Sequence, residues 1–274
     1  MKSKLVVLVT FAFLFGIPLS ERTSAQQPQM EYDSHLPGLD DNSKTRRPEA
    51  PVAREPRVIE NGPLALTAQD LNYYAGLLAE PNTGLIRLLP RTNPKSTFAY
   101  GGERPALNGG GAYFSFHYRS HQYGYGSDLE LQAVQDLHVQ NGFQTEMPPH
   151  YILSVGFAGA DFGMLENLGD VSLMDLSPSD SRAAYLLAYQ PPKAESAARA
   201  EFHRFGSGVT LDGVTYKRSL PCEVNATYLL RSVNYDVSDV LLAFHVERQD
   251  SDGSVVIAWK LLKSFPVTQL ARNK

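Results

Sequence analysis

The stretch that decides the fold class runs from Tyr228 to Leu262 and reads YLLRSVNYDVSDVLLAFHVERQDSDGSVVIAWKLL. Within it, residues 228–235, 240–248 and 255–262 form runs rich in β-branched and aromatic side chains. Runs of this length and composition are typical of β-strands. The last two runs are separated by a loop that includes Asp252-Gly253, a pair favoured in hairpin turns. We therefore predict a three-stranded antiparallel meander near the C-terminal end of the core.

The second predicted strand carries apolar side chains on both faces. Val240 and Leu242 alternate with Leu241 and Ala243, and successive side chains of a strand point to opposite faces. We expect such a strand at the centre of a sheet that is covered on both sides. In the third strand the single tryptophan, Trp259, lies on an apolar face, so we expect it to be buried.

The chain between residue 84 and this meander reads mainly as short strands separated by turns. We expect strands over residues 85–89, 97–100, 112–118, 128–133, 151–155 and 184–189, because clusters of Gly, Pro, Asn and Asp separate these runs. The composition, 43% hydrophobic and 20% charged, is ordinary for a globular protein. The predicted fold class is mainly β, with β-sandwich-like antiparallel sheets and two short helices.

The two expected helices have recognisable ends. Thr67 is suited to cap the first, with Asp70 at the third helical position as in a capping box. The second helix is expected over residues 193–205, after a pair of prolines, with Gly206 as its C-terminal cap. Small residues on its inner face would let it pack closely against a sheet.

The first 63 residues read as two non-globular segments. Lys2 and Lys4 precede an apolar run over residues 5–19, so residues 1–25 are expected to be a signal peptide cleaved near Ala25. Residues 26–63 are rich in proline and in charges of both signs, which predicts a disordered tether. Residues 64–274 are expected to form one mainly β domain; if this domain divides, the break would fall near residue 191.

These features imply an exported protein, secreted or periplasmic, of a bacterial type, with no transmembrane segment in the mature chain. The formal net charge of −4 is unfavourable for binding nucleic acid or an anionic membrane surface, because both need basic patches. Cys222 is the only cysteine, so no internal disulfide can form. We expect its thiol to be buried and inert, rather than reactive.

The candidate site lies in a glycine- and tyrosine-rich stretch, residues 109–132. The ends of this stretch alternate like paired strands, and polar and aromatic side chains beyond those that the alternation requires gather around the loop between them. Exposed tyrosines offer amphipathic contact surface for sugars, peptides or proteins. The predicted binding residues are His117, Arg119, His121, Tyr123, Tyr125, Asp128 and Glu130. The alternative is that the tyrosines pack over the end of the sheet.

The sequence gives no motif for catalysis or for a cofactor. It contains no Gly-x-Ser-x-Gly, His-Glu-x-x-His, Ser-x-x-Lys or Cys-x-x-Cys, so we expect no cofactor. His117 and His121 are the best metal candidates, with Asp128 and Glu130 as oxygen ligands. Their placement on a strand and a loop is poorly suited to a four-ligand site, so we expect no metal. Residues 250–253 read as a hairpin turn rather than a calcium loop.

Three functions fit these features. The favoured one is a non-catalytic binding or cell-envelope-associated β domain that recognises a glycan or an envelope protein. One alternative is a secreted hydrolase, glycosidase- or esterase-like, with carboxylates such as Asp128 and Glu130 as acid and base, because two such carboxylates leave no motif in a sequence. The other is a structural component of an envelope assembly, which predicts an exposed sheet edge.

Overall fold

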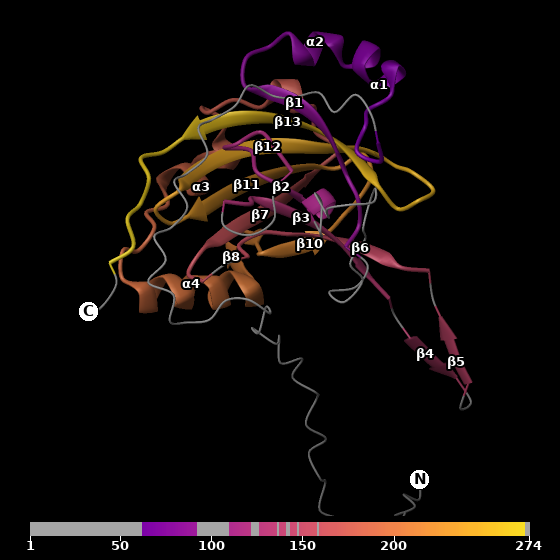
Figure 1. Ribbon diagram of the computed structural model, residues 1–274. Helices are drawn as coiled ribbons and strands as arrows, with labels where there is room; N and C mark the ends of the chain where they lie inside the picture. Colours follow the sequence, from indigo (N-terminus) through magenta and orange to yellow (C-terminus); the bar gives the residue numbers. More distant parts are fainter. Residues whose placement is uncertain are drawn as a thin grey trace, which may run out of the picture. The chain divides into compact units, whose positions relative to one another are not determined.

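The computed structural model describes residues 62–91, 110–121, 126–135, 137–140, 143–146, 148–157 and 159–271 (Figure 1). All of them belong to one compact unit, Pro48–Lys274. The predicted signal peptide, nearly all of the predicted tether and the predicted strand at residues 97–100 lie outside the described residues. The described part consists mostly of antiparallel β-sheet with a few short helices, as the sequence predicts.

The largest sheet contains the predicted C-terminal meander. Its strands are all antiparallel and follow the order β1 (Thr83–Leu88), β13 (Val255–Ser264), β12 (Ser238–Gln249), β11 (Thr227–Asn234) and β7 (Phe162–Gly169). Phe244 of the central strand β12 lies opposite Trp259 on one side and Tyr228 on the other. The meander is therefore confirmed, whereas β7 is a strand that we did not predict.

A second antiparallel sheet has the order β10 (Ser219–Pro221), β6 (His150–Ser154), β3 (Leu129–Val134) and β2 (Tyr113–Phe114). Its strands β3 and β6 correspond to the runs predicted at residues 128–133 and 151–155. Two more pairs form separate two-stranded sheets, β4 (Leu137–Gln140) with β5 (Phe143–Glu146) and β8 (Val209–Leu211) with β9 (Val214–Tyr216).

The helical segments lie before β1 and after β7, apart from one turn before β2. They are α1 (Ala68–Tyr73), α2 (Ala75–Leu78), α3 (Ala184–Ala188) and α4 (Glu195–Ser207), with 3-10 turns η1 (Gly110–Ala112), η2 (Leu173–Asp175) and η3 (Ser181–Ala183). The predicted capping box of α1 is present. The Asp70 N–H donates to the Thr67 hydroxyl and the Thr67 N–H donates to the Asp70 carboxylate, both at 3.0 Å.

The region around α3 corrects two predictions. Residues 184–189, which we expected to be a strand, form α3 and its C-cap. Alanine and leucine favour a helix in this run, and Asp180 starts the turn before it by accepting the Arg182 N–H at 2.9 Å. The predicted second helix exists as α4, but its C-cap is Gly208 rather than Gly206. Gly208 has a φ of 96°, which glycine adopts at little cost.

Each face of the five-stranded sheet carries its own hydrophobic cluster. The inter-sheet core joins this sheet to the second sheet and includes Leu88, Phe114, Leu129, Leu131, Leu153, Leu165, Tyr228, Leu242, Phe244 and Trp259. Trp259 is 1% exposed, which confirms its predicted burial. Its indole also fills the space beside β1, because a Cβ added at Gly84 would lie 2.6 Å from the ring.

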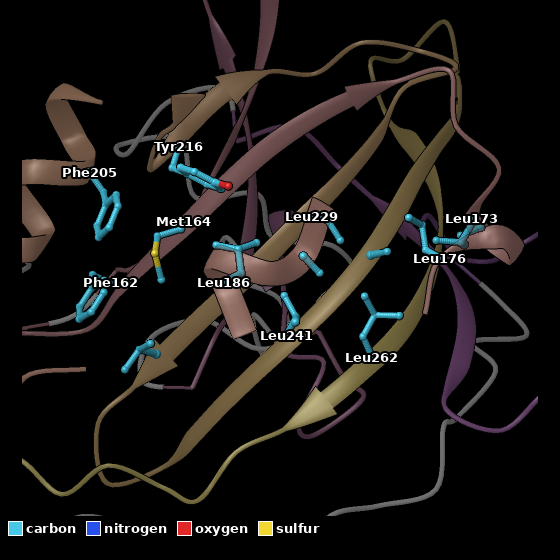
Figure 2. Packing of buried hydrophobic residues seen from close by; sticks show 14 of the residues in the cluster. Phe162, Met164, Leu173, Leu176, Leu186, Phe205, Tyr216, Leu229, Leu241 and Leu262 are labelled. Carbon is cyan, nitrogen blue, oxygen red and sulfur yellow. The ribbon is translucent and has the colours of Figure 1, made fainter. Parts of the chain in front are cut away.

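The second cluster, the helix-covered core, lies between the opposite face of the sheet and the segments that follow β7. Figure 2 shows α3 crossing the sheet, with Leu186 close to Leu229 and Leu241. Phe205 of α4 stacks on Phe162 of β7, with ring centroids 6.0 Å apart. Because β12 contributes apolar side chains to both clusters, the prediction that it is covered on both faces is confirmed.

Candidate functional site

The predicted hairpin at residues 112–133 has a shorter first strand than the alternation suggests. Only Tyr113 and Phe114 form a strand, β2, which pairs with β3. The chain then turns, and Ser115 and Ser120 exchange backbone hydrogen bonds of 2.9 and 3.2 Å. The prediction of a strand as far as residue 118 is therefore wrong. Its physical reason is that the Phe116 N–H donates to a buried carboxylate, Asp128, instead of to a neighbouring strand.

Asp128 is the centre of a buried polar network. Its Oδ2 accepts the N–H of Phe116 at 2.7 Å and that of His117 at 3.4 Å, and its Oδ1 accepts the Asn234 amide at 2.8 Å. Burial raises the pKa of Asp128, although these hydrogen bonds favour its charged form. The carboxyl group therefore ties the turn at residues 115–120 to β11.

Glu130, two residues further along the chain, has a similar role. Arg91 donates to its Oε1 at 2.9 Å and Gln132 donates to its Oε2 at 2.6 Å. Arg91 also donates to the Tyr113 hydroxyl at 2.7 Å, so these contacts join the chain after β1 to the second sheet. Asp128 and Glu130 lie on the face opposite Leu129, as the alternation predicts, but both are fully buried.

Arg119 and His121 hold the far side of the same turn. Arg119, which has a φ of 50°, donates to the Asn82 side-chain oxygen at 3.0 Å. His121 Nε2 lies 2.8 Å from the Arg87 carbonyl oxygen, which can only accept, so this nitrogen donates. Burial lowers the pKa of His121, and the neutral imidazole is sufficient for this bond.

Those predicted site residues that the structure describes are therefore not gathered into one acid–base or metal cluster. The structure brings His117 and Asp128 together, but through the His117 backbone N–H. The imidazole of His117 instead packs edge-on against Tyr118, with ring centroids 4.7 Å apart. Tyr123 and Tyr125 lie outside the described residues.

A titratable group that the sequence did not single out lies on the helix-covered face. Glu166 of β7 is 5% exposed, and its Oε2 has no hydrogen-bond partner. Burial raises the pKa of this carboxyl to about 7, and the positive charge of Arg182 opposes that rise. Once β7 is recognised, a signal is visible in the sequence: Glu166 follows the buried Phe162 and Met164 at a spacing of two, on the same face.

The same face carries a chain of polar groups near the end of β12. The Thr227 hydroxyl donates to the Val171 carbonyl, so the His245 Nδ1–H donates to the Thr227 oxygen, at 2.7 Å. His245 Nε2 lies 3.9 Å from Glu247, which also accepts a hydrogen bond from the Tyr74 hydroxyl. Burial raises the pKa of Glu247. Because Thr227 is fully buried, this series of polar groups offers no accessible nucleophile. It instead holds Tyr74, between α1 and α2, against the sheet.

Three further observations limit the chemistry. Among the described residues, no group of three or more His, Cys, Asp and Glu side chains could hold a metal ion. No helix in the described part of the chain is long and apolar enough to cross a membrane. Cys222 is partly buried, whereas the sequence predicted a buried thiol, and burial raises the pKa of this thiol to about 12.

Comparisons with known proteins identify no relative: no family model, curated protein or solved structure matches this chain. The function is therefore argued from the geometry of the site.

Proposed function

We propose that the protein is an exported, non-catalytic binding domain that recognises a glycan or a cell-envelope protein through the loop from Arg119 to Gly126. In this proposal residues 1–25 are a cleaved signal peptide and residues 26–63 are a disordered tether. The domain itself has a β-sandwich-like core, which is supported by the inter-sheet core that both large sheets share.

The observation that carries this proposal is the anchoring of both ends of the loop. On one side, the Ser115–Ser120 bridge closes the preceding turn, and the bond from His121 to the Arg87 carbonyl ties the chain to β1. On the other, Gly126 packs so closely on Tyr118 that an added Cβ would lie 2.8 Å from the ring. Fixed loop ends on a rigid scaffold lower the entropy lost when a loop binds a partner.

The surroundings of the two predicted acid–base carboxylates support binding over hydrolysis. Asp128 and Glu130 are fully buried, and each accepts hydrogen bonds from at least two donors. A general acid or base must reach a substrate atom directly or through one water molecule. The contacts of both carboxylates support a role in holding the turn and the second sheet.

The loop is tested by the double variant Tyr123→Ala, Tyr125→Ala. We expect it to lose retention on peptidoglycan and on solubilised envelope protein, measured by co-sedimentation and pull-down. The melting temperature should stay nearly unchanged, because the proposal places both rings in solvent and substitutions at exposed sites usually cost less than about 0.5 kcal/mol. Tyr73→Ala is the matched control, since this tyrosine of α1 is 79% exposed and belongs to another part of the domain. Retention equal to wild type, or unfolding of the double variant, would contradict the proposal.

Export is tested separately by the mass of the mature protein. Expression with a bacterial secretion system should give a periplasmic or extracellular product that begins after Ala25. A full-length product retained in the cytoplasm would contradict the export part of the proposal and leave the binding part to the first experiment.

A further inference from the structure

Glu166 is a buried acid with incomplete hydrogen bonding. It projects from β7 into the helix-covered core, on the side lined by Met164, Leu229 and Leu186. Tyr216 of β9 acts on the pKa of its carboxyl group, and Figure 2 shows Tyr216 beside Met164. One carboxyl oxygen of Glu166, Oε2, has no hydrogen-bond partner. A neutral carboxyl tolerates such a site much better than a carboxylate does.

The charged groups that face Glu166 come from the segment before α3. The charge of Arg182 in η3 lowers the pKa of Glu166, and the charge of Asp180, the N-cap of η3, raises it. These two residues already hold each other, because Arg182 Nη2 and Nε donate to Asp180 at 2.6 and 2.9 Å. Asp175 of η2 also acts on Arg182, so two carboxylates compete for this guanidinium.

The other elements near Glu166, within the described part of the chain, bring phenols and an apolar side chain to it. Tyr216 and Tyr185 lie against each other with ring centroids 4.7 Å apart, and both are phenols. On the sheet, the residue directly opposite Glu166 is Leu229 of β11. Lys217 pairs with Leu165 through its backbone, while the stem of its side chain packs against Gly208. An ionised Glu166 therefore gains a full ion pair only if Arg182 leaves Asp180.

We propose that Glu166 is a pH-sensitive latch: residues 180–188 stay closed on the sheet while this buried carboxyl is protonated, and loss of its proton favours opening of the segment, because water then reaches a carboxylate that has no ion-pair partner in the closed form. This device is independent of the proposed binding function. It requires that a buried group titrate in the range where the fold is otherwise stable, and burial raises the pKa of Glu166 to about 7. In the open segment the carboxyl would return to its ordinary value of 4.5.

The sign of the effect follows from these two values. Between pH 4.5 and 7 the closed form retains a proton that the open form has lost, so closing becomes less favourable as the pH rises. The difference between these two pKa values of Glu166 corresponds to a change on the order of a hundredfold in the opening equilibrium. Above pH 7 both forms are ionised and the equilibrium no longer changes with pH.

The test is amide hydrogen exchange of α3, corrected for the intrinsic pH dependence of exchange. Its reporter is the Tyr189 amide, which donates to the Tyr185 carbonyl at 3.0 Å. In the wild type we expect its protection to fall on the order of a hundredfold between pH 5 and pH 8. In Glu166→Gln we expect constant protection, and in the control Glu195→Gln, which removes a more exposed carboxylate on α4, we expect the wild-type fall. Constant protection in the wild type, or an equal fall in Glu166→Gln, would overturn the proposal.

Two further measurements keep the test decisive if Glu166→Gln folds poorly. Infrared spectroscopy of the wild type should show a buried protonated carboxyl band that disappears near neutral pH, and its absence at pH 5 would overturn the proposal. Arg182→Gln should move the midpoint of the exchange profile to higher pH, because the arginine charge favours the ionised carboxyl. An unchanged or lower midpoint would contradict the effect of the Arg182 charge on Glu166.

Discussion

The two faces of the five-stranded sheet carry different kinds of buried side chains. The face toward the second sheet is mainly apolar, with the buried contact between Asn234 and Asp128 at one end. Aromatic rings meet there: the ring centroids of Trp259 and Phe116 lie 5.4 Å apart, and those of the stacked Tyr228 and Phe244 lie 5.0 Å apart. The face under the helices also has an apolar core, but it includes the Arg231–Asp239 ion pair, Glu166, and the chain from Thr227 to Glu247.

This difference separates pH-independent stability from pH-dependent behaviour. Apolar burial stabilises a fold in proportion to the area removed from water and involves no proton. Buried titratable groups add free-energy terms that change with pH, because their pKa values differ between the folded and unfolded states. We therefore expect substitutions in the inter-sheet core to lower stability at every pH, and substitutions of the charged groups under the helices to change its pH profile.

The largest effect is expected from Trp259→Ala in the inter-sheet core. Removing a fully buried indole leaves a cavity, so the free energy of unfolding should fall by roughly 3–5 kcal/mol, toward the upper end of that range. Urea unfolding followed by circular dichroism measures this change, and the loss should be the same at pH 5 and pH 8. In the native wild type the indole fluorescence should be blue-shifted and poorly quenched by iodide. Red-shifted, easily quenched emission would mean that the faces of β13 are assigned the wrong way round.

A slightly smaller effect is expected from Asp239→Ala under the helices. Arg231 is 1% exposed, donates to both Asp239 oxygens at 2.9 Å, and also donates to the Leu186 and Tyr189 carbonyls at the end of α3. Removing only the carboxylate leaves a buried guanidinium without its counter-charge, which costs about 3 kcal/mol. Chemical denaturation measures the loss. The double variant Arg231→Met, Asp239→Leu should recover part of it; a double variant less stable than Asp239→Ala would contradict this reasoning.

The smallest effect is expected where the helices begin. Thr67→Ala removes the hydroxyl that accepts the Asp70 N–H at the start of α1, which should cost about 1 kcal/mol. Asp70 remains paired with Arg248, so α1 should stay attached to β12. Thermal unfolding compared with the conservative variant Thr67→Ser measures the difference. Equal losses in the serine and alanine variants would show that the hydroxyl is not the stabilising group.

The apolar face of the sheet could be predicted from the sequence because alternation and strand length report it directly. The strands β11, β12 and β13, the burial of Trp259, and the capping box at Thr67 all follow from patterns within a few residues. The strand β7 could not be predicted because its sequence, FGMLENLG, contains two glycines and a polar pair, which are uncommon in strands. Residues 184–189 were misassigned because a short apolar run has no period that separates a strand from a buried helix.

The candidate site was only partly predictable for a different reason. Alternation correctly placed Asp128 and Glu130 on the face opposite Leu129, yet it could not show that this face is covered. Burial there depends on Asn234 and Arg91, which are distant in sequence. Glu166 depends in the same way on Arg182 and Tyr216, so its altered titration arises only from the tertiary fold.

The claim that Glu166 links the helix-covered face to a proton is tested most directly by the pH dependence of unfolding in the wild type and in Glu166→Gln. The carboxyl keeps its proton in the folded state up to about pH 7 and loses it near 4.5 when unfolded, so its stabilising contribution is complete below pH 4.5 and is lost as the pH rises to 7. Urea denaturation at pH 4.5, 6 and 8 should show the wild type losing about 3 kcal/mol relative to Glu166→Gln across this range. Parallel profiles for the two proteins would contradict the account.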